Sequence, residues 1–546
     1  MHPSPAYAIF EVAQRGNVEE CERVVQLDRS LLTRRGWSGF TPLHYAAFQG
    51  NRKLSELFLK NGADPNIPSD AGQTAFHLSC RHGDVYVIHL MLKHGADLSI
   101  VDHQGKTALH QSVSGGNIIA IRYIEDTGVF SFSDTDKFLV NPLHLAVSTG
   151  NIDVVKYLLR NNRCQAHAAD NQGMTAMHVA AERGAIEISW ILLQQFGFQL
   201  LHLKNKGGLT PVDLCRQGTT YRHKQLTKIL CDFINQPVEQ KPKASYGMYY
   251  WALLFPAISG SIVLLIAAVL GKYGGIFCGL VFPSLAKSIF SQYHRMNSYQ
   301  RLPNPIYLGT FAAGIFHSLL CFFHKIMPII SPVNALLLMS VTHFTAMLWM
   351  FRLVLTKDPG RLRRADTDSK FTTIAELVEA NQNPYKFCIH CEMIQPDKSR
   401  HCKLCNICVL EYDHHCLFLN NCVAKNNHRI FVIFIMELIV AHVIFIVSAL
   451  YYIYLKYNRP FLTVWTTVIS EEVWVLVLTV MNAFTLIWES WLLKEQFEAI
   501  SMGTTTYFKQ NSDRRYSRSL RCRTFFMFLI EDKRRHDFQL ERSIDI

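Results

Sequence analysis

The first residues of this 546-residue chain lack the basic start and the long apolar run of a secretory signal peptide. We therefore expect the N-terminal part of the chain to stay in the cytosol. The sequence also lacks a separate nucleic-acid-binding module, so its formal net charge of +12 does not indicate a nucleic-acid partner. Hydrophobic residues make up 49% of the chain, and the mean hydropathy of +0.09 is high for a protein made only of ordinary soluble domains.

The cysteines are also unevenly spread. Of the 15 cysteines, seven lie between Cys388 and Cys422. This clustering favours metal binding over disulfides and indicates a reducing compartment.

A phrase of the form T-P-L-H-x-A recurs through the first half of the chain at a period of roughly 33 residues. Its copies begin at Thr41, Thr74, Thr107, Asn141, Thr175 and Thr210. The pattern indicates ankyrin repeats, in which each unit is a turn and two helices, and stacking buries the faces that one unit leaves exposed. With a degenerate first repeat over residues 6–32, we predict about seven units within residues 1–236. Such a stack offers a surface for protein partners and has no catalytic machinery of its own.

The histidines of this phrase invite a metal-binding hypothesis, but a structural role is the better interpretation. At this position a histidine is expected to form hydrogen bonds between its side chain and the backbone at the turn between repeats. The histidines concerned are His44, His77, His110, His144 and His178.

Six long apolar stretches follow a polar linker at residues 237–249. We place them at roughly 250–271, 273–291, 306–327, 333–355, 430–455 and 473–493. Each is near the ~20 residues that an α-helix needs to cross a bilayer. The second is the least regular, because Pro283 and Lys287 interrupt it. The sequence therefore predicts spans one to four within residues 250–355 and spans five and six within residues 430–493.

Parity and charge give the orientation of these spans. If the N-terminal domain is cytosolic, four crossings return the chain to the cytosol, and two more leave the tail, residues 494–546, there as well. Lysine and arginine are more frequent in the loops that this assigns to the cytosol, as the positive-inside bias requires. Ionisable groups within the spans are expected to face the bundle interior, away from lipid. They include His317, His343, Glu437, His442 and Glu489.

The segment between the fourth and fifth spans, residues 356–429, is rich in soft metal ligands. The candidates are Cys388, Cys391, His401, Cys402, Cys405, Cys408, His414, His415, Cys416 and Cys422, with His390 as an outlier. A structural zinc ion takes four nitrogen or sulfur ligands, so two sites need eight. Each C-x2-C pair supplies two ligands from one turn, whereas sequence neighbours point apart and serve different sites. One arrangement assigns Cys388, Cys391, His401 and Cys408 to one zinc and Cys402, Cys405, His415 and Cys422 to another.

This count leaves Asp413, His414 and Cys416 unused. A cysteine thiol is mostly protonated near neutral pH, so a neighbouring histidine is needed to take its proton, and an aspartate can orient that histidine. The alternative is that Cys416 is a spare cysteine in a purely structural zinc module. Counting alone does not decide which histidine binds the metal.

The cysteine-rich segment closely resembles that of DHHC protein S-acyltransferases. The whole chain is similar to their ankyrin-repeat branch, the huntingtin-interacting type. The matching motifs are C-x2-C at Cys388, His401-Cys402, C-x2-C-x2-C from Cys402 to Cys408, Asp413-His414-His415-Cys416, Asn421-Cys422, N-x3-F at Asn427 and Phe431, and D-P-G at 358–360.

The resemblance implies two structural zinc ions with the ligand sets given above. It also implies that Cys416 is the nucleophile acylated by palmitoyl-CoA, with His414 as the base and Asp413 as the group that orients it. The acyl group would pass to a membrane-proximal cysteine of a protein substrate that the ankyrin repeats help to recruit. The acyl chain would lie in a cavity among the membrane helices, with Cys416 at the cytosolic boundary. The Golgi or another endomembrane is the implied location.

The sequence departs from the family pattern at three places. Leu417, Phe418 and Leu419 stand where the family usually has proline and tryptophan residues, and Phe418 is the tentative acyl-chain contact. Ala424 stands where the family has glycine. The threonine motif after the last span, residues 503–508, lacks its usual glutamate. We expect these changes to affect acyl-chain fit and rate rather than the nucleophile.

Two other functions are alternatives to acyl transfer. A catalytically weak scaffold would use the ankyrin surface to gather partners. A six-span cation channel would need a pore loop between the fifth and sixth spans, where the connection is short.

The repeats, the apolar stretches and the cysteine-rich segment together predict a multidomain, mainly α-helical fold. It consists of an ankyrin-repeat solenoid and a six-helix transmembrane domain with a cytosolic zinc-binding domain between spans four and five.

Overall fold

A computed structural model describes residues 5–243, 246–292, 303–330, 334–363, 371–458, 461–509 and 518–531. The chain is mainly helical, with an N-terminal repeat region, several apolar helices and a cysteine-rich segment, so the predicted fold class is confirmed. The described residues form two compact units. One contains residues 5–243 and 371–394, and the other contains the remainder. Residue 333 of the predicted fourth span and parts of the predicted tail (510–517 and 532–546) lie outside the described residues.

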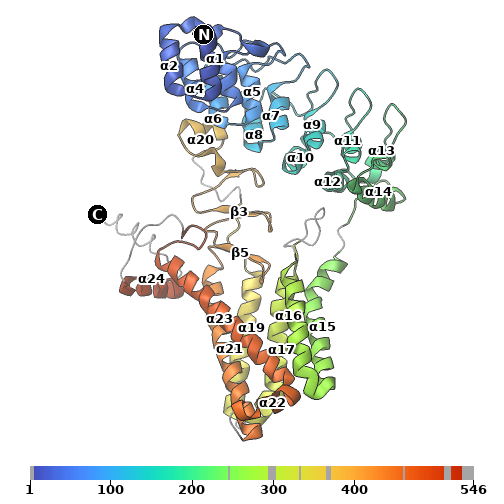
Figure 1. Ribbon diagram of the computed structural model, residues 1–546, viewed down its shortest axis with the longest axis vertical. Coiled ribbons are helices and arrows are strands. Elements are labelled where there is room, and N and C mark those ends of the chain that lie inside the picture. The colour runs from blue at the N-terminus through green and yellow to red at the C-terminus, as the bar shows by residue number, and fades with distance from the viewer. Residues whose placement is uncertain are drawn as a thin grey trace. The chain divides into compact units, whose positions relative to one another are not determined.

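The first unit is a stack of helix pairs (Figure 1). Successive first helices pack on one another, as do successive second helices, so that each pair covers an apolar face of its neighbour. The helices are α1 (Pro5–Arg15), α2 (Val18–Leu27), α3 (Pro42–Phe48), α4 (Arg52–Lys60), α5 (Ala75–His82), α6 (Val85–Lys93), α7 (Ala108–Gly115), α8 (Ile118–Asp126), α9 (Pro142–Thr149), α10 (Ile152–Leu159), α11 (Ala176–Glu182), α12 (Ile186–Phe196), α13 (Pro211–Gln217) and α14 (Tyr221–Ile234).

Four of the motif histidines bond to the backbone of the next repeat, as predicted: His44, His110, His144 and His178. Thr41 caps α3, and its backbone N–H donates to Nδ1 of His44 over 3.1 Å. Nε2 of the same ring lies 3.0 Å from the carbonyl oxygen of Gln73 in the next repeat. Burial lowers the pKa of His44 to about 4, so this ring stays neutral at physiological pH. The histidine therefore serves the turn, and no metal is needed to explain it.

A segment far along the chain completes the first unit. It contains α20 (Ile374–Glu379) and the hairpin of β1 (Phe387–Cys388) and β2 (Met393–Ile394). Thr373 and Glu376 form a capping box that begins α20. Ile374 and Val378 on this helix are buried in the same hydrophobic core as the repeat helices.

The second unit is built on long apolar helices. These are α15 (Gly247–Leu270), α16 (Gly274–Phe290), α17 (Ile306–Cys321), α18 (Met327–Ile330), α19 (Asn334–Thr356), α21 (His428–Tyr457), α22 (Phe461–Glu471), α23 (Val473–Ser501) and α24 (Arg518–Glu531). A π-turn at Phe322–Ile326 joins α17 to α18. Helices α15 and α17 pack together, as do α19, α21 and α23, which run side by side in Figure 1.

Five helical segments in the described residues are long and apolar enough to cross a membrane. They are Gly247–Leu270, Ile306–Ile330, Leu337–Thr356, His428–Tyr457 and Val473–Ser501. The second predicted span corresponds to α16, which has 17 residues, contains Pro283 and is at the short limit for crossing. Six crossings therefore stay a prediction. The connection between α21 and α23 contains the short helix α22, which the sequence did not predict.

The five ionisable groups predicted to face the bundle interior are buried or half-buried: His317, His343, Glu437, His442 and Glu489. Nε2 of His442 lies 3.3 Å from a carboxylate oxygen of Glu489, whose side chain is 2% exposed. His343 lies 3.3 Å from Glu437 in the same way. Side chains of this kind inside an apolar bundle need such partners, because lipid offers none.

Candidate active site and metal centres

Two hairpins of the second unit hold six of the eight candidate ligands and the candidate nucleophile; Cys388 and Cys391 belong to the hairpin of β1 and β2. One pairs β3 (Arg400–Cys402) with β4 (Ile407–Val409), and the other pairs β5 (His414–Cys416) with β6 (Asn421–Val423). In an antiparallel ladder, directly opposed residues point to the same face. His401 lies opposite Cys408, and His415 lies opposite Cys422. Each hairpin therefore presents one histidine and one cysteine together.

Each C-x2-C sequence forms the same tight turn. The N–H of Cys391 donates to Sγ of Cys388 over 3.4 Å, and the N–H of Cys405 donates to Sγ of Cys402 over 3.5 Å. The residue after each second cysteine has a positive φ, 52° at Glu392 and 55° at Asn406. We call each of these turns a knuckle. A knuckle turns both thiols inward and leaves them close enough to share one ion.

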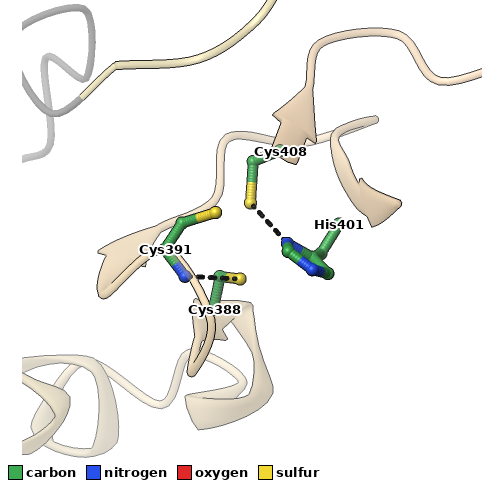
Figure 2. A group of neighbouring side chains, drawn as sticks. All are labelled: Cys388, Cys391, His401 and Cys408. Atoms are coloured by element: carbon green, nitrogen blue, oxygen red, sulfur yellow. Dashed lines mark hydrogen bonds between the residues drawn. The ribbon is translucent and has the colours of Figure 1, made fainter. Parts of the chain in front are cut away.

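The first group of ligands contains Cys388, Cys391, His401 and Cys408, whose ligand atoms all lie within 4.8 Å of one another. Figure 2 shows the thiols of the first knuckle and the side chains of His401 and Cys408 turned toward a common centre. Sγ of Cys408 lies 3.7 Å from Nδ1 of His401.

The second group contains Cys402, Cys405, His415 and Cys422, also within 4.8 Å. Nδ1 of His415 lies 3.5 Å from Sγ of Cys402, 3.2 Å from Sγ of Cys405 and 3.7 Å from Sγ of Cys422. A zinc ion with bonds of about 2.3 Å to sulfur and 2.0 Å to nitrogen places its tetrahedral ligands roughly 3.5–3.8 Å apart. The donor types and spacing of both groups therefore fit structural zinc, and they are the two groups expected from the sequence.

The pleat of β5 separates the candidate metal ligand His415 from His414 and Cys416. Successive side chains of a strand point to opposite faces, so His414 and Cys416 share one face and His415 takes the other. Cys416 is 8% exposed and belongs to the hydrophobic core of the helical bundle. The candidate nucleophile thus lies at the apolar side of the hairpin, beside the candidate base.

Asp413 fixes the orientation and the tautomer of the His414 ring. A carboxylate oxygen of Asp413 lies 2.8 Å from Nδ1 of His414, and the Asp413 side chain is fully buried. Because an ionised carboxylate only accepts hydrogen bonds, Nδ1 carries a proton and Nε2 is left for the thiol. The ring of Phe431 packs edge-on against His414, with the ring centres 5.4 Å apart.

The electrostatics of this pair favour its charged forms. Burial disfavours the ionised carboxylate of Asp413, but the nearby rings of His428 and His414 hold its pKa well below the ordinary range. Loss of water contact likewise opposes protonation of His414, but Asp413 and the Cys416 thiol together raise the pKa of the ring to about 10. His414 is therefore able to accept a proton from Cys416.

Three residues that sequence reasoning missed also hold Asp413. Nε2 of Gln496 on α23 donates to Oδ2 over 3.0 Å, and the backbone N–H of Thr506 donates to Oδ1 over 2.7 Å. Nε2 of His428 lies 2.5 Å from Oε1 of Gln496. Both His428 and Gln496 are completely buried. The threonine motif therefore holds Asp413 through its backbone, although it lacks the family's glutamate.

Other motif residues brace the hairpin. The N–H of Ala424 donates to the side-chain oxygen of Asn427 over 2.9 Å, and Nδ2 of Asn427 donates to the carbonyl oxygen of Cys422 over 2.8 Å. Ala424 is fully buried beside Cys402 and Cys422 in a small core, so its methyl group is accommodated.

Phe418 lies in an aromatic cluster of the helical bundle. Its ring centre is 6.0 Å from that of Tyr307, 6.3 Å from Phe311 and 5.2 Å from Trp488. These rings come from α17 and α23. Two residues past Cys416, Phe418 is therefore embedded among the apolar helices rather than turned to the metal.

Known families match two parts of the chain. Residues 381–513 match DHHC palmitoyltransferase. Residues 54–129 and 125–202 match ankyrin repeats in three copies, and residues 38–67 match a single ankyrin repeat.

Solved structures that are similar to this chain include two ankyrin repeat domains. The ankyrin repeat domain of Bcl-3, described as a unique member of the IkappaB protein family, is 25% identical, with 42% of this chain and 99% of that one covered and a TM-score of 0.33. The human ASB11 ankyrin repeat domain is 19% identical, with 43% and 99% covered and a TM-score of 0.36.

Proposed function

We propose that this chain, which combines a DHHC palmitoyltransferase domain with ankyrin repeats, is a membrane-embedded protein S-acyltransferase. The main support is that His414 and Cys416 share one face of β5, while Asp413 accepts a hydrogen bond from Nδ1 of the histidine ring. This arrangement provides a thiol, a base that can take its proton, and a carboxylate that orients the base.

The reaction proceeds in two thioester exchanges. The Cys416 thiol gives its proton to Nε2 of His414, and its sulfur attacks the acyl carbonyl of palmitoyl-CoA. The carbon–sulfur bond to CoA breaks, and the CoA thiolate takes the proton from His414. Nε2 of His414 then takes the proton of a substrate cysteine thiol, whose sulfur attacks the acyl-Cys416 carbonyl. The bond between the acyl carbon and Cys416 breaks, and the leaving Cys416 thiolate takes the proton back from His414. No net oxidation occurs in either step.

The metal and the bundle support this chemistry without taking part in it. Two zinc ions, bound by the two Cys₃His groups, would fix the hairpins and supply structural stability. Burial of Cys416 against the apolar helices suits a long acyl chain, which stays out of water while CoA and the protein substrate remain in it. Phe418 and the rings around it would contact the acyl chain. The ankyrin stack would recruit protein substrates with membrane-proximal cysteines.

The proposal extends to topology and location. We place the cysteine-rich segment and both ends of the chain in the cytosol, and the protein in the Golgi or another endomembrane. The uneven distribution of lysine and arginine between the loops supports the orientation.

The direct test is acylation of the purified full-length protein. Incubation with a clickable palmitoyl-CoA should give a label that hydroxylamine removes, and Cys416→Ser should abolish it. Equal labelling of the wild type and Cys416→Ser would show that the nucleophile is wrong. A chain with intact zinc that acquires no label at all would instead be a scaffold.

A further inference from the structure

The segment 371–394 packs against the ankyrin repeats of its own unit. Helix α20 lies beside α6 and α8, as Figure 1 shows. The hydroxyl of Tyr86 on α6 donates to the carbonyl oxygen of Gln382 over 3.2 Å. The ring of Phe387, directly before Cys388, is also buried in the core of the repeats. The residues leading into the first knuckle are thus fixed by the repeat stack.

A buried ion pair fixes the other side of this knuckle. Glu392 follows Cys391, and its carboxylate accepts two hydrogen bonds from Arg163, of 2.8 and 3.0 Å. Arg160 donates to the same carboxylate over 3.3 Å and to the carbonyl oxygen of Ile389, inside the knuckle, over 3.1 Å. The Glu392 side chain is 3% exposed and that of Arg163 is 10% exposed, so water screens this pair little.

Arg163 is itself held in place by the repeats. Its Nε donates to Glu125 over 2.8 Å, and its guanidinium lies over the ring of Tyr157, 4.5 Å from the centre. The hydroxyl of Tyr157 donates to the same Glu125 carboxylate. A planar guanidinium fixed on two sides presents its remaining donors in one direction, toward Glu392.

Glu392 is an unexpected residue for its backbone conformation. Its φ of 52° lies in the left-handed region, which a non-glycine residue seldom adopts and which asparagine tolerates best. The same position of the second knuckle is Asn406, with a φ of 55°. Local geometry alone would favour asparagine at both positions. The ion pair with Arg163 accounts for glutamate at the first.

We propose that the ankyrin stack is a structural part of the first zinc site: Arg163 anchors Glu392 and so fixes the Cys388–Cys391 knuckle in the geometry that holds the metal. The inference rests on the proposed binding of zinc but not on acyl transfer. It also assigns part of the surface of α6 and α8 to an internal segment, which leaves client proteins the other faces of the stack.

The test uses the full-length protein in detergent and the substitution Glu392→Asn. This change gives the first knuckle the residue of the second, so it suits the backbone and removes only the anchor. Zinc release to a coloured chelator is followed over time, and backbone hydrogen exchange is followed in residues 371–394. We expect one of the two zinc ions to leave about tenfold faster or more, because the knuckle is no longer held. Exchange in 371–394 should rise as well. Release and exchange at wild-type rates would overturn the proposal.

Substitutions on the repeat side separate anchoring from general damage. Arg163→Met should reproduce the faster release, and the milder Tyr86→Phe should raise exchange in 371–394 even if Arg163→Met does not fold. Arg35→Met is the matched control, because it removes an exposed 3.1 Å pair with Asp70 in the same stack. Equal acceleration by Arg35→Met would count against the proposal.

The proposed function and this inference fail in different ways. Neither zinc release nor hydrogen exchange involves acyl-CoA. If the wild type is not acylated but Glu392→Asn still speeds zinc release and exchange in residues 371–394, the result counts against acyl transfer alone. A wild-type protein with no zinc would overturn the inference.

Discussion

Gln496 and Asp413 are joined by a 3.0 Å hydrogen bond between buried side chains that lie 83 residues apart in the chain. The amide of Gln496 donates to the oxygen of Asp413 that also accepts from His414. His428 in turn lies against the amide oxygen of Gln496. The carboxylate that orients the candidate base is therefore itself oriented by two helices, α21 and α23.

We predict that Gln496→Leu slows acylation of Cys416. The substitution keeps the approximate volume but removes the donor to Asp413 and leaves His428 without its amide partner, so His414 is less firmly oriented. The single-turnover rate with palmitoyl-CoA should fall by about 10- to 100-fold, within the range that general-base groups contribute. The zinc content should stay at two per chain.

The neighbouring substitution Glu495→Gln is the control for this experiment. Glu495 neighbours Gln496 on α23, and the substitution removes the charge of Glu495 from a partly exposed 3.1 Å contact with Lys509 while it leaves Asp413 untouched. A normal acylation rate in Gln496→Leu would show that Gln496 has no positioning role.

Metal analysis should separate the two kinds of cysteine in the cluster. Cys405→Ala removes a ligand of the second group, so the protein should lose one zinc ion and unfold at a lower temperature. Cys416→Ala removes a thiol outside both groups and should keep both ions. Elemental analysis and thermal unfolding of the purified proteins measure this difference. Loss of zinc from Cys416→Ala would place that thiol in the metal shell instead.

Substitution of Phe418 should change the preference for acyl-chain length. The ring fills space between Tyr307, Phe311 and Trp488, so Phe418→Ala enlarges that space and should favour longer acyl-CoA substrates relative to palmitoyl-CoA. A series of acyl-CoA chain lengths, compared at equal concentration, gives the profile. Tyr385→Ala is a suitable control because Tyr385 is 58% exposed and lies outside the aromatic cluster. An unchanged profile would remove Phe418 from the acyl-chain contact.

Glu472 should be important for the stability of the helical bundle. Its side chain is 1% exposed and binds two lysines, Lys325 at 2.6 Å and Lys456. Glu472→Gln leaves two cations without their shared carboxylate, and because both lysines are partly exposed this costs less than the about 3–5 kcal/mol of a fully buried pair. The midpoint of thermal unfolding in detergent should therefore fall. Glu471→Gln, which affects an exposed contact with Tyr457, should change it little, and equal shifts in both would contradict the prediction.

The repeats and the metal groups were predictable because both are local in sequence. The phrase that begins at Thr41 returns at a fixed period, and the histidine in it bonds to its own cap and to the next repeat. The two C-x2-C turns and the alternation of strand side chains decide which cysteine or histidine joins which group. The repeats and the two metal groups are therefore predictable from residues that lie near one another in the sequence.

The partners of Asp413 and Glu392 were not predictable in the same way. Gln496 lies in α23, where a single amide in the sequence does not indicate a contact with Asp413. The donor from Thr506 is a backbone N–H, which nearly every residue type has, so the sequence does not mark it either. Arg163 and Glu392 are 229 residues apart, and each resembles an ordinary surface charge in the sequence. Only the tertiary fold brings these groups together and buries them.

The hairpin of β5 and β6 places a strict limit on how this region can change in evolution. Along His414-His415-Cys416, the proposed catalytic residues and the proposed metal ligand alternate because strand side chains alternate. Insertion or deletion of one residue would exchange the two faces, so that the thiol would point to the metal and the ligand to the base. The length of this run is therefore constrained as strictly as its residue types.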